Sequence, residues 1–271
     1  MTAKIHPTAI IHPGAVLGED VEVGPYAVIG EDVKIGAGTK VGPHCFIEFA
    51  TIGKNNNFVA ACYVGTPPQD YSYSGQKTTL VMGDNNIVRE GVTLHRGSPK
   101  HGETVIGGGC MFMANSHVGH DCQLGSRIIM VNSAGFSGHV EVGDSAVISG
   151  LSGFHQFCRV GRMAMVGGGS MSGKDIPPFC IVQGDRAHLV GLNLVGMRRN
   201  GISRESIRSV RETYKELFLR GMRLSEAIGK LKGANLSPEA REMVEFCEKG
   251  TRGIMRARMS CSRRAGNDGE E

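Results

Sequence analysis

Apolar residues recur at every sixth position through most of the chain. Between Ile106 and Val166 the series is unbroken, and glycine follows many of its members. A helix repeats its apolar positions about every 3.6 residues and a half-buried strand about every second residue, so a period of six indicates short strands joined by tight turns. We predict a parallel β-helix in which three hexads make one coil, so that residues eighteen apart stack at the ~4.8 Å strand spacing. The glycines would stand where a Cβ would clash.

The hexad pattern begins at Ile5, and two polar segments interrupt it. These segments, residues 66–78 and 98–104, are predicted to be loops ejected from the coils, where function tends to concentrate. The apolar repeat stops after Met171. The Asp-Ile-Pro-Pro segment that follows predicts the end of the regular ladder, because proline has no N–H to donate. We assign residues 1–186 to the β-helix.

Beyond about residue 193 the pattern becomes that of helices. Three segments carry apolar residues on one face, and they cover residues 204–220, 225–232 and 237–248. Ser203 is a candidate N-cap for the first of them, and Gly221 would close it. We therefore predict a small helical domain over residues 187–259. The tail over residues 260–271 has little to bury and is predicted to be disordered.

Composition excludes several classes of protein. The net charge of +4 is mild and the chain has no tryptophan, which together disfavour nucleic-acid binding. No signal-peptide pattern and no apolar run near ~18 residues is present, so we predict a cytoplasmic protein without a membrane segment. The eight cysteines form no C-x-x-C pair. Cys110, Cys122 and Cys158 share one hexad position, and we expect them to be small inward-facing residues rather than disulfides or nucleophiles.

Histidines are set into the central repeat. His120, His139 and His155 would line one face of the solenoid over three successive coils, with His117 beside them. Histidine is the side chain best suited to accept a proton near neutral pH, so this face is the candidate catalytic site. The other histidines singled out are interpreted as solvated or packing residues, namely His6, His12, His44 and His101.

Several short motifs, taken in order, resemble one family of hexapeptide-repeat enzymes, the UDP-N-acetylglucosamine O-acyltransferases. The similarity spans about residues 3–256 and includes Asn-Ser-His-Val-Gly-His-Asp at 115–121, Gly-His-Val at 138–140, His-Gln-Phe at 155–157 and Gln-Gly-Asp at 183–185. The resemblance implies a left-handed β-helix and a homotrimer with active sites between adjacent subunits. It also implies transfer of a 3-hydroxyacyl chain from acyl carrier protein to the 3-hydroxyl of a UDP-sugar, the first step of lipid A synthesis.

The resemblance also assigns roles to individual residues. It makes His120 the general base, Asp121 its orienting partner and the Gly138 N–H an oxyanion donor, with no acyl-enzyme, cofactor or metal. Gly168 would cap the acyl groove and so set the length of the accepted chain, and Arg211 would contact the carrier protein. The residues implied to bind substrate are Gln69, Asp70, His117, His139, His155, Gln156, Asn193 and Arg199.

Three positions depart from the family pattern, and they leave the acceptor open. Ser72 and Val195 stand where the family commonly has Lys and Glu, and Asn200 stands where it has Arg. An acceptor with an amine at C3 is therefore an alternative. Two other classes also remain, a hexapeptide-repeat zinc carbonic anhydrase and a purely structural solenoid. A related N-acyltransferase is disfavoured, because such enzymes usually carry a further N-terminal domain.

Overall fold

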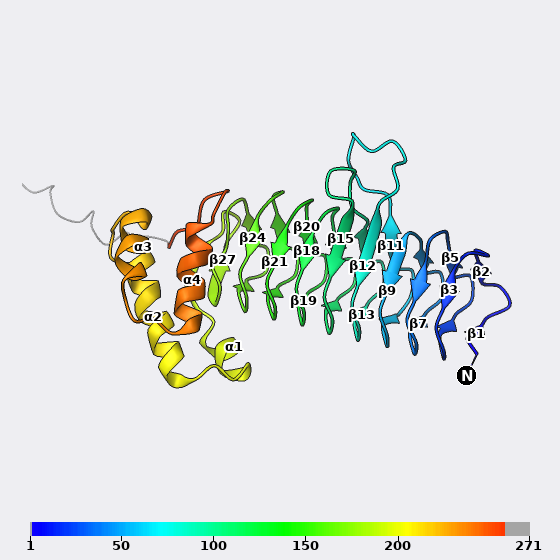
Figure 1. Cartoon of the computed structure of the whole chain (residues 1–271), viewed down its shortest axis with the longest axis horizontal. Coiled ribbons are helices and arrows are strands. Elements are labelled where there is room, and N and C mark those ends of the chain that lie inside the picture. The colour runs from blue at the N-terminus through cyan, green and yellow to red at the C-terminus, as the bar shows by residue number, and fades with distance from the viewer. Residues whose placement is uncertain (1, 258–271) are drawn as a thin grey trace, which may run out of the picture.

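The computed structural model describes residues 2–257, and they form a parallel β-helix followed by four helices. Figure 1 shows the solenoid as a rod, with its N-terminus at one end and the helices α2 to α4 at the other. Each coil contributes one strand to each of three sheets, so strands three apart in sequence order lie side by side. The predicted fold class of a β-helix followed by a helical part is confirmed.

The bounds of the strands are as follows. The 11-stranded sheet contains β1 (Lys4–Ile5), β4 (Glu22–Val23), β7 (Lys40–Val41), β10 (Asn57–Phe58), β13 (Ile87–Val88), β16 (Met111–Phe112), β19 (Ile129–Met130), β22 (Val147–Ile148), β25 (Met165–Val166), β27 (Cys180–Gln183) and β28 (His188–Leu192). The 9-stranded sheet contains β2 (Ile10–Ile11), β5 (Val28–Ile29), β8 (Phe46–Ile47), β11 (Tyr63–Thr66), β14 (Thr93–His95), β17 (His117–Val118), β20 (Gly135–Phe136), β23 (Gly153–Phe154) and β26 (Met171–Ser172). The 8-stranded sheet contains β3 (Val16–Leu17), β6 (Lys34–Ile35), β9 (Ala50–Ile52), β12 (Thr79–Met82), β15 (Glu103–Ile106), β18 (Gln123–Leu124), β21 (Glu141–Val142) and β24 (Arg159–Val160).

The strand register confirms the eighteen-residue coil. Phe112 pairs with Met130 and Met130 with Ile148, and all three side chains are fully buried. The residue that opens each hexad therefore points into the core, whereas its neighbour in the two-residue strand faces outward. Cys110, Cys122 and Cys158 are buried as predicted. Burial raises the pKa of the Cys158 thiol to about 11, which leaves it protonated at neutral pH.

The glycines of the repeat stand where neighbouring coils approach closely. A Cβ on Gly119 would lie 2.9 Å from the Gly138 nitrogen of the next coil, so no larger residue fits without a shift of backbone. The residues with a left-handed backbone stand at another position of the hexad, and most of them are not glycine. Asp121, two residues after Gly119, has φ 60°, and His139, one coil further, has φ 61°. Asp and His tolerate this region better than most residues.

Both interruptions of the hexad pattern leave the solenoid at one corner. The first loop connects β11 to β12 and the second connects β14 to β15, so each crosses from the 9-stranded to the 8-stranded sheet in successive coils. Figure 1 shows them projecting on the same side of the rod. The same corner in the next coils carries His120 and His139.

The predicted end of the ladder after Met171 is wrong, because two further strands, β27 and β28, extend the 11-stranded sheet. Beyond the two prolines β27 resumes the 11-stranded sheet, with Met165 paired in parallel to Ile181. The prolines occupy the corner between sheets, where no ladder N–H is required. β28 then adds an antiparallel strand that ends at Leu192, so the division placed between residues 186 and 187 falls within a hairpin.

The helical part begins with α1 (Leu194–Arg199) and continues with α2 (Arg204–Phe218), α3 (Leu224–Lys232) and α4 (Pro238–Glu248). The three helices predicted from sequence are confirmed, and Ser203 and Ser237 cap α2 and α4 by accepting backbone N–H groups. Arg162 joins α4 to the last coils through a salt bridge of 2.8 Å to Glu242. The tail predicted to be disordered, residues 260–271, lies outside the described residues.

Candidate active site

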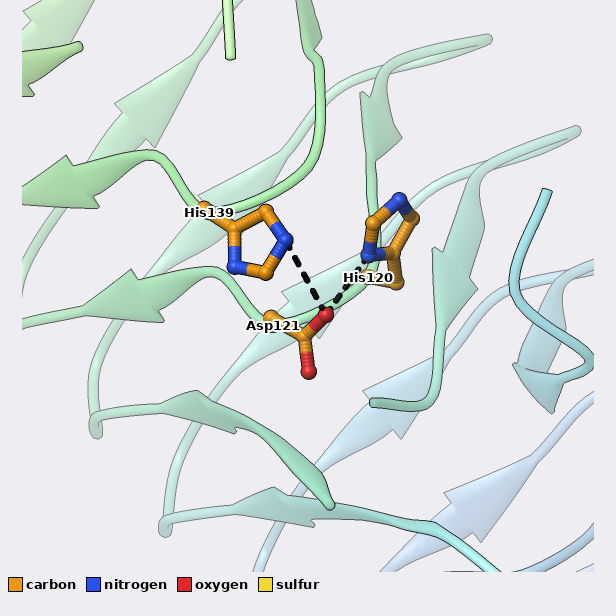
Figure 2. A group of neighbouring side chains, drawn as sticks. All are labelled: His120, Asp121 and His139. Atoms are coloured by element: carbon orange, nitrogen blue, oxygen red, sulfur yellow. Dashed lines mark hydrogen bonds and ion pairs between the residues drawn. The ribbon is translucent and has the colours of Figure 1, made fainter. Parts of the chain in front are cut away.

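A histidine and an aspartate form a buried dyad at the corner after β17. His120 Nδ1 lies 2.7 Å from Asp121 Oδ2, and the carboxylate is fully buried. Figure 2 shows the imidazole turned toward this carboxylate. An ionised carboxylate has no proton to give, so His120 Nδ1 donates and Nε2 keeps its lone pair. This is the arrangement in which a carboxylate orients a histidine base.

The second loop holds the aspartate in place. The Ser98 N–H donates to Asp121 Oδ1 over 2.8 Å, and the Asp121 N–H donates to the Thr104 hydroxyl over 2.8 Å. Burial acts to raise the pKa of Asp121, but the hydrogen bonds from His120 and Ser98 outweigh it and hold that pKa below its usual value. Asp121 is therefore a carboxylate at neutral pH.

His139 approaches the same carboxylate from the next coil. Its Nε2 lies 3.5 Å from Asp121 Oδ2, and its ring packs edge-on against the ring of His120. Phe157, one coil further along, stacks on the His139 ring with the centroids 4.4 Å apart. Burial lowers the pKa of His139, although the Asp121 charge opposes this. A neutral His139 leaves His120 as the main partner of the carboxylate.

The corner position of His120 is occupied by Gly138 and Gln156 in the two following coils. A Cβ on Gly138 would lie 2.5 Å from His120 Cε1, so glycine is what allows the imidazole to lie there. The Gly138 carbonyl accepts a hydrogen bond from Phe157, whereas its own N–H makes none within the described residues. A free N–H beside the candidate base is suited to bind an oxyanion.

A cleft of about 390 Å³ is lined by His117, His120, Gly138 and Gln156, among other residues, whereas Asp121 and His139 are not part of its lining. Gln69, from the first loop, forms one of its walls. Asp70 follows it, and the Ser72 N–H donates to its carboxylate over 2.9 Å. This contact and the Ser72 hydroxyl lower the pKa of Asp70. The serine that departs from the family pattern thus holds the loop aspartate.

The cleft is also lined by His95, a histidine that the sequence analysis did not single out. His95 is 6% exposed, and its ring packs edge-on against His117 with the centroids 5.1 Å apart. The Thr93 hydroxyl lies 2.7 Å from His117 Nδ1 and fixes that ring. Thr93 precedes His117 by 24 residues rather than eighteen, because the second loop lies between them. The eighteen-residue spacing would have placed Thr93 beneath His117 only if the residues of the second loop had been left out of the count.

His155 does not join the other histidines as predicted. It occupies the corner column of Gly119 and Ser137, one position away from that of His120, and its exposed ring lines a separate pocket with Lys174 and Arg186. The expectation of three imidazoles on one face is therefore wrong for His155, which lies two coils beyond the coil of His120. His139 lies one coil beyond Asp121, so its ring meets both Asp121 and the ring of His120.

Four other predicted residues lie away from the cleft within one chain. Both polar atoms of Asn193 are engaged, with Nδ2 donating to the Met163 carbonyl and Oδ1 capping α1. Arg199 is exposed at the end of α1 and Arg211 is exposed on α2. Gly168 follows β25, at the corner between the 11- and 9-stranded sheets. Their roles stay predictions.

His120, Asp121 and His139 also satisfy the spacing of a metal site, since their ligand atoms lie within 4.8 Å of one another. Two imidazoles and a carboxylate are suitable zinc ligands. The short bond from His120 Nδ1 to Asp121, however, already accounts for both partners without a metal. The geometry of the dyad fits proton transfer, and dialysis against a chelator would distinguish this role from metal binding.

The buried imidazoles predict acid sensitivity. Burial, followed by the neighbouring His117, lowers the pKa of His95 to about 4. An unfolded chain, whose histidines have a pKa near ~6.5, then binds more protons than the folded one between about pH 6.5 and 4. Stability is present above this window and is lost as the pH falls through it. We expect His95 to account for about 2 kcal/mol lost at pH 5 relative to pH 8. Urea unfolding at several pH values measures this loss.

The matched variant for this prediction is His95→Gln, which keeps a polar side chain but does not titrate. Its stability should fall less between pH 8 and pH 5 than that of the wild-type protein. Burial also lowers the pKa of His117, which therefore adds to the wild-type loss in the same direction. An equal slope for both proteins would show that His95 does not carry the effect.

Comparison with known proteins agrees with this geometry. Residues 175–255 match the family model "Udp N-acetylglucosamine O-acyltransferase; Domain 2", and residues 14–49 match "Bacterial transferase hexapeptide (six repeats)". The chain is 44% identical over 256 residues to the acyl-[acyl-carrier-protein]–UDP-N-acetylglucosamine O-acyltransferase of Halorhodospira halophila, covering 93% of this chain and 99% of that protein.

Solved structures give the same result. LpxA from Acinetobacter baumannii superposes with a TM-score of 0.90 at 42% identity, over 93% of this chain and 99% of that one. The Francisella novicida UDP-N-acetylglucosamine acyltransferase superposes with a TM-score of 0.91 at 37% identity, over 93% and 94%. These similarities confirm the left-handed form of the β-helix. On this identity and coverage, the chain belongs to the family of acyl-[acyl-carrier-protein]–UDP-N-acetylglucosamine O-acyltransferases.

Proposed function

We propose that this chain transfers a 3-hydroxyacyl group from acyl carrier protein to the 3-hydroxyl of UDP-N-acetylglucosamine, the first step of lipid A synthesis. The observation that carries the proposal is the His120–Asp121 dyad, 2.7 Å apart and facing a cleft whose other wall is Gln69. A purely structural solenoid would need neither a buried carboxylate paired with a histidine nor a loop placed over them.

The proposed reaction uses no covalent acyl-enzyme. His120 Nε2 takes the proton of the sugar hydroxyl as its oxygen attacks the thioester carbonyl, and the new C–O bond gives a tetrahedral oxyanion. The free N–H of Gly138 would stabilise that charge. Collapse of the intermediate breaks the C–S bond, and the His120 imidazolium returns its proton to the leaving sulfur. Asp121 stabilises the imidazolium while it lasts.

Two acceptors are consistent with the departures from the family pattern. Ser72 is occupied with Asp70 and supplies no positive charge to a bound substrate. Assays with UDP-N-acetylglucosamine and its C3-amino analogue, each with hydroxyacyl carrier proteins of several lengths, decide between an oxygen and a nitrogen nucleophile. Activity with neither acceptor would contradict the proposed function.

A homotrimer is proposed because one chain does not complete the site. Arg199, Arg211 and Gly168 do not line the cleft of His120, so they would reach a substrate there only from a neighbouring subunit. Light scattering of the purified protein should give about three times 28.9 kDa. A stable and fully active monomer would contradict this proposal. With acyl carrier protein as donor, we propose a cytoplasmic location.

Among residues 2–257, no helix has the length and the apolar character of a membrane span.

Acyl transfer is expected to be independent of metal. Because Asp121 orients His120 directly, prolonged dialysis against a chelator should leave kcat within about twofold of its starting value. Elemental analysis before and after dialysis provides the control for metal content. Loss of activity that zinc restores would instead favour the metal site considered above.

A further inference from the structure

A buried arginine joins the first loop to the solenoid. Arg96, at the end of β14, is 5% exposed and donates from Nη1 to the Glu48 carboxylate over 2.9 Å and to the Gly65 carbonyl over 2.7 Å. Its Nη2 donates to the Tyr73 hydroxyl over 2.7 Å. Gly65 lies where the first loop begins and Tyr73 lies within that loop. One guanidinium therefore contacts both the start of the loop and its interior.

Two aromatic rings also pack near the guanidinium. Its carbon lies 4.4 Å from the centre of the Phe49 ring and 5.5 Å from that of the Tyr73 ring. Glu48 balances its charge. A buried arginine that loses such partners is costly, and lysine cannot replace its fork of donors.

The backbone of Arg96 contacts the same stretch of loop. The Arg96 N–H donates to the Thr66 carbonyl over 3.1 Å. Arg96 thus holds two successive residues where the loop begins, Gly65 through its side chain and Thr66 through its backbone. Gln69 follows three residues later and forms a wall of the catalytic cleft.

We propose that Arg96 and Tyr73 form a latch that positions the first loop over the cleft and thereby sets the affinity for the sugar nucleotide. Both are positioning residues, because neither lines the cleft of His120. The inference rests on the proposed function for its substrate, but the latch itself is testable without turnover.

Tyr73→Phe is the sharpest variant, because it removes one hydroxyl and keeps the ring against Arg96. A hydrogen bond to a charged group is worth roughly tenfold in an equilibrium constant. We expect Tyr73→Phe to raise KM for UDP-N-acetylglucosamine about tenfold, with kcat and KM for the acyl carrier protein within about twofold. Arg96→Lys should produce the same pattern with a larger rise.

Lys77→Met is the matched control. This substitution removes another contact between the first loop and the solenoid, the ion pair of Lys77 with Asp32 at 2.6 Å. Both side chains of this pair are exposed at the surface. Exposed ion pairs contribute little, so KM should stay within about twofold. An equal rise in KM for Lys77→Met and Tyr73→Phe would overturn the latch. So would a fall in kcat that leaves KM for the sugar nucleotide unchanged.

Hydrogen exchange separates failure of the latch from failure of the proposed function. Amides of residues 66–78 should exchange at least several-fold faster in Tyr73→Phe than in the wild-type protein, while those of the β-helix core should not change. Unchanged exchange in the loop would overturn the latch, whatever the activity. A wild-type protein inactive on UDP-N-acetylglucosamine, with loop exchange accelerated in the variant, would overturn only the acceptor.

Discussion

Replacement of His120 by asparagine is expected to lower kcat by at least ~10², the usual scale for loss of a general base. Asparagine can still donate to Asp121, so the buried carboxylate keeps a partner, but its amide cannot accept a proton from the sugar hydroxyl. We therefore expect the melting temperature and the oligomeric state to match those of the wild-type protein. Steady-state kinetics with both substrates saturating measure the effect.

His44→Asn is a suitable control for this substitution. His44 also stands at a left-handed corner, with φ 57°, but its exposed ring stacks on Tyr26 in an early coil, away from the cleft. Asparagine tolerates that conformation, so kcat should not change. Turnover close to wild type for His120→Asn, in a preparation free of wild-type enzyme, would refute the role of His120.

The second large effect is expected at Gly168, where a methionine should shift the enzyme toward shorter acyl donors. A Cβ there would meet only the Gly150 carbonyl, at 3.6 Å, and the left-handed φ of 66° belongs to Gly169 instead. The side chain therefore fits without backbone strain, and if Gly168 caps the acyl groove, the methionine side chain would occupy that groove. Exclusion of three methylenes, at ~0.8 kcal/mol each, would cost about 2.4 kcal/mol, or roughly fiftyfold in relative kcat/KM.

Measurement of kcat/KM across donors of increasing length tests this ruler. Gly168→Ala should give a smaller shift in the same direction, because it adds a single carbon. An unchanged length profile for folded Gly168→Met would refute the assignment. A uniform loss over all donors would indicate that glycine there serves only the fold.

The amino-acid sequence by itself determined the solenoid, the position of both loops and, to within two residues, the boundaries of α2 to α4; α2 ends at Phe218 rather than at Arg220. It could do so because each coil is built from contacts between residues at a constant spacing, and each of these helices carries its own apolar face and start or stop signal. The dyad was also within reach of the sequence, since His120 and Asp121 are adjacent. Recognition of their role depended on the resemblance to a family.

Only the tertiary structure decided which side chains meet across coils. His139 reaches Asp121, but His155 lies in another column, because two positions stack only when their separation matches whole coils, as 120 and 138 do. Loop insertions change that spacing, so Thr93 and His95 were not connected to His117. The latch was equally hidden, since Arg96 meets Glu48 and Tyr73 through folds of the chain that no periodic pattern records. Short-range periodicity fixes the coil, whereas long-range contacts at its corner fix the site.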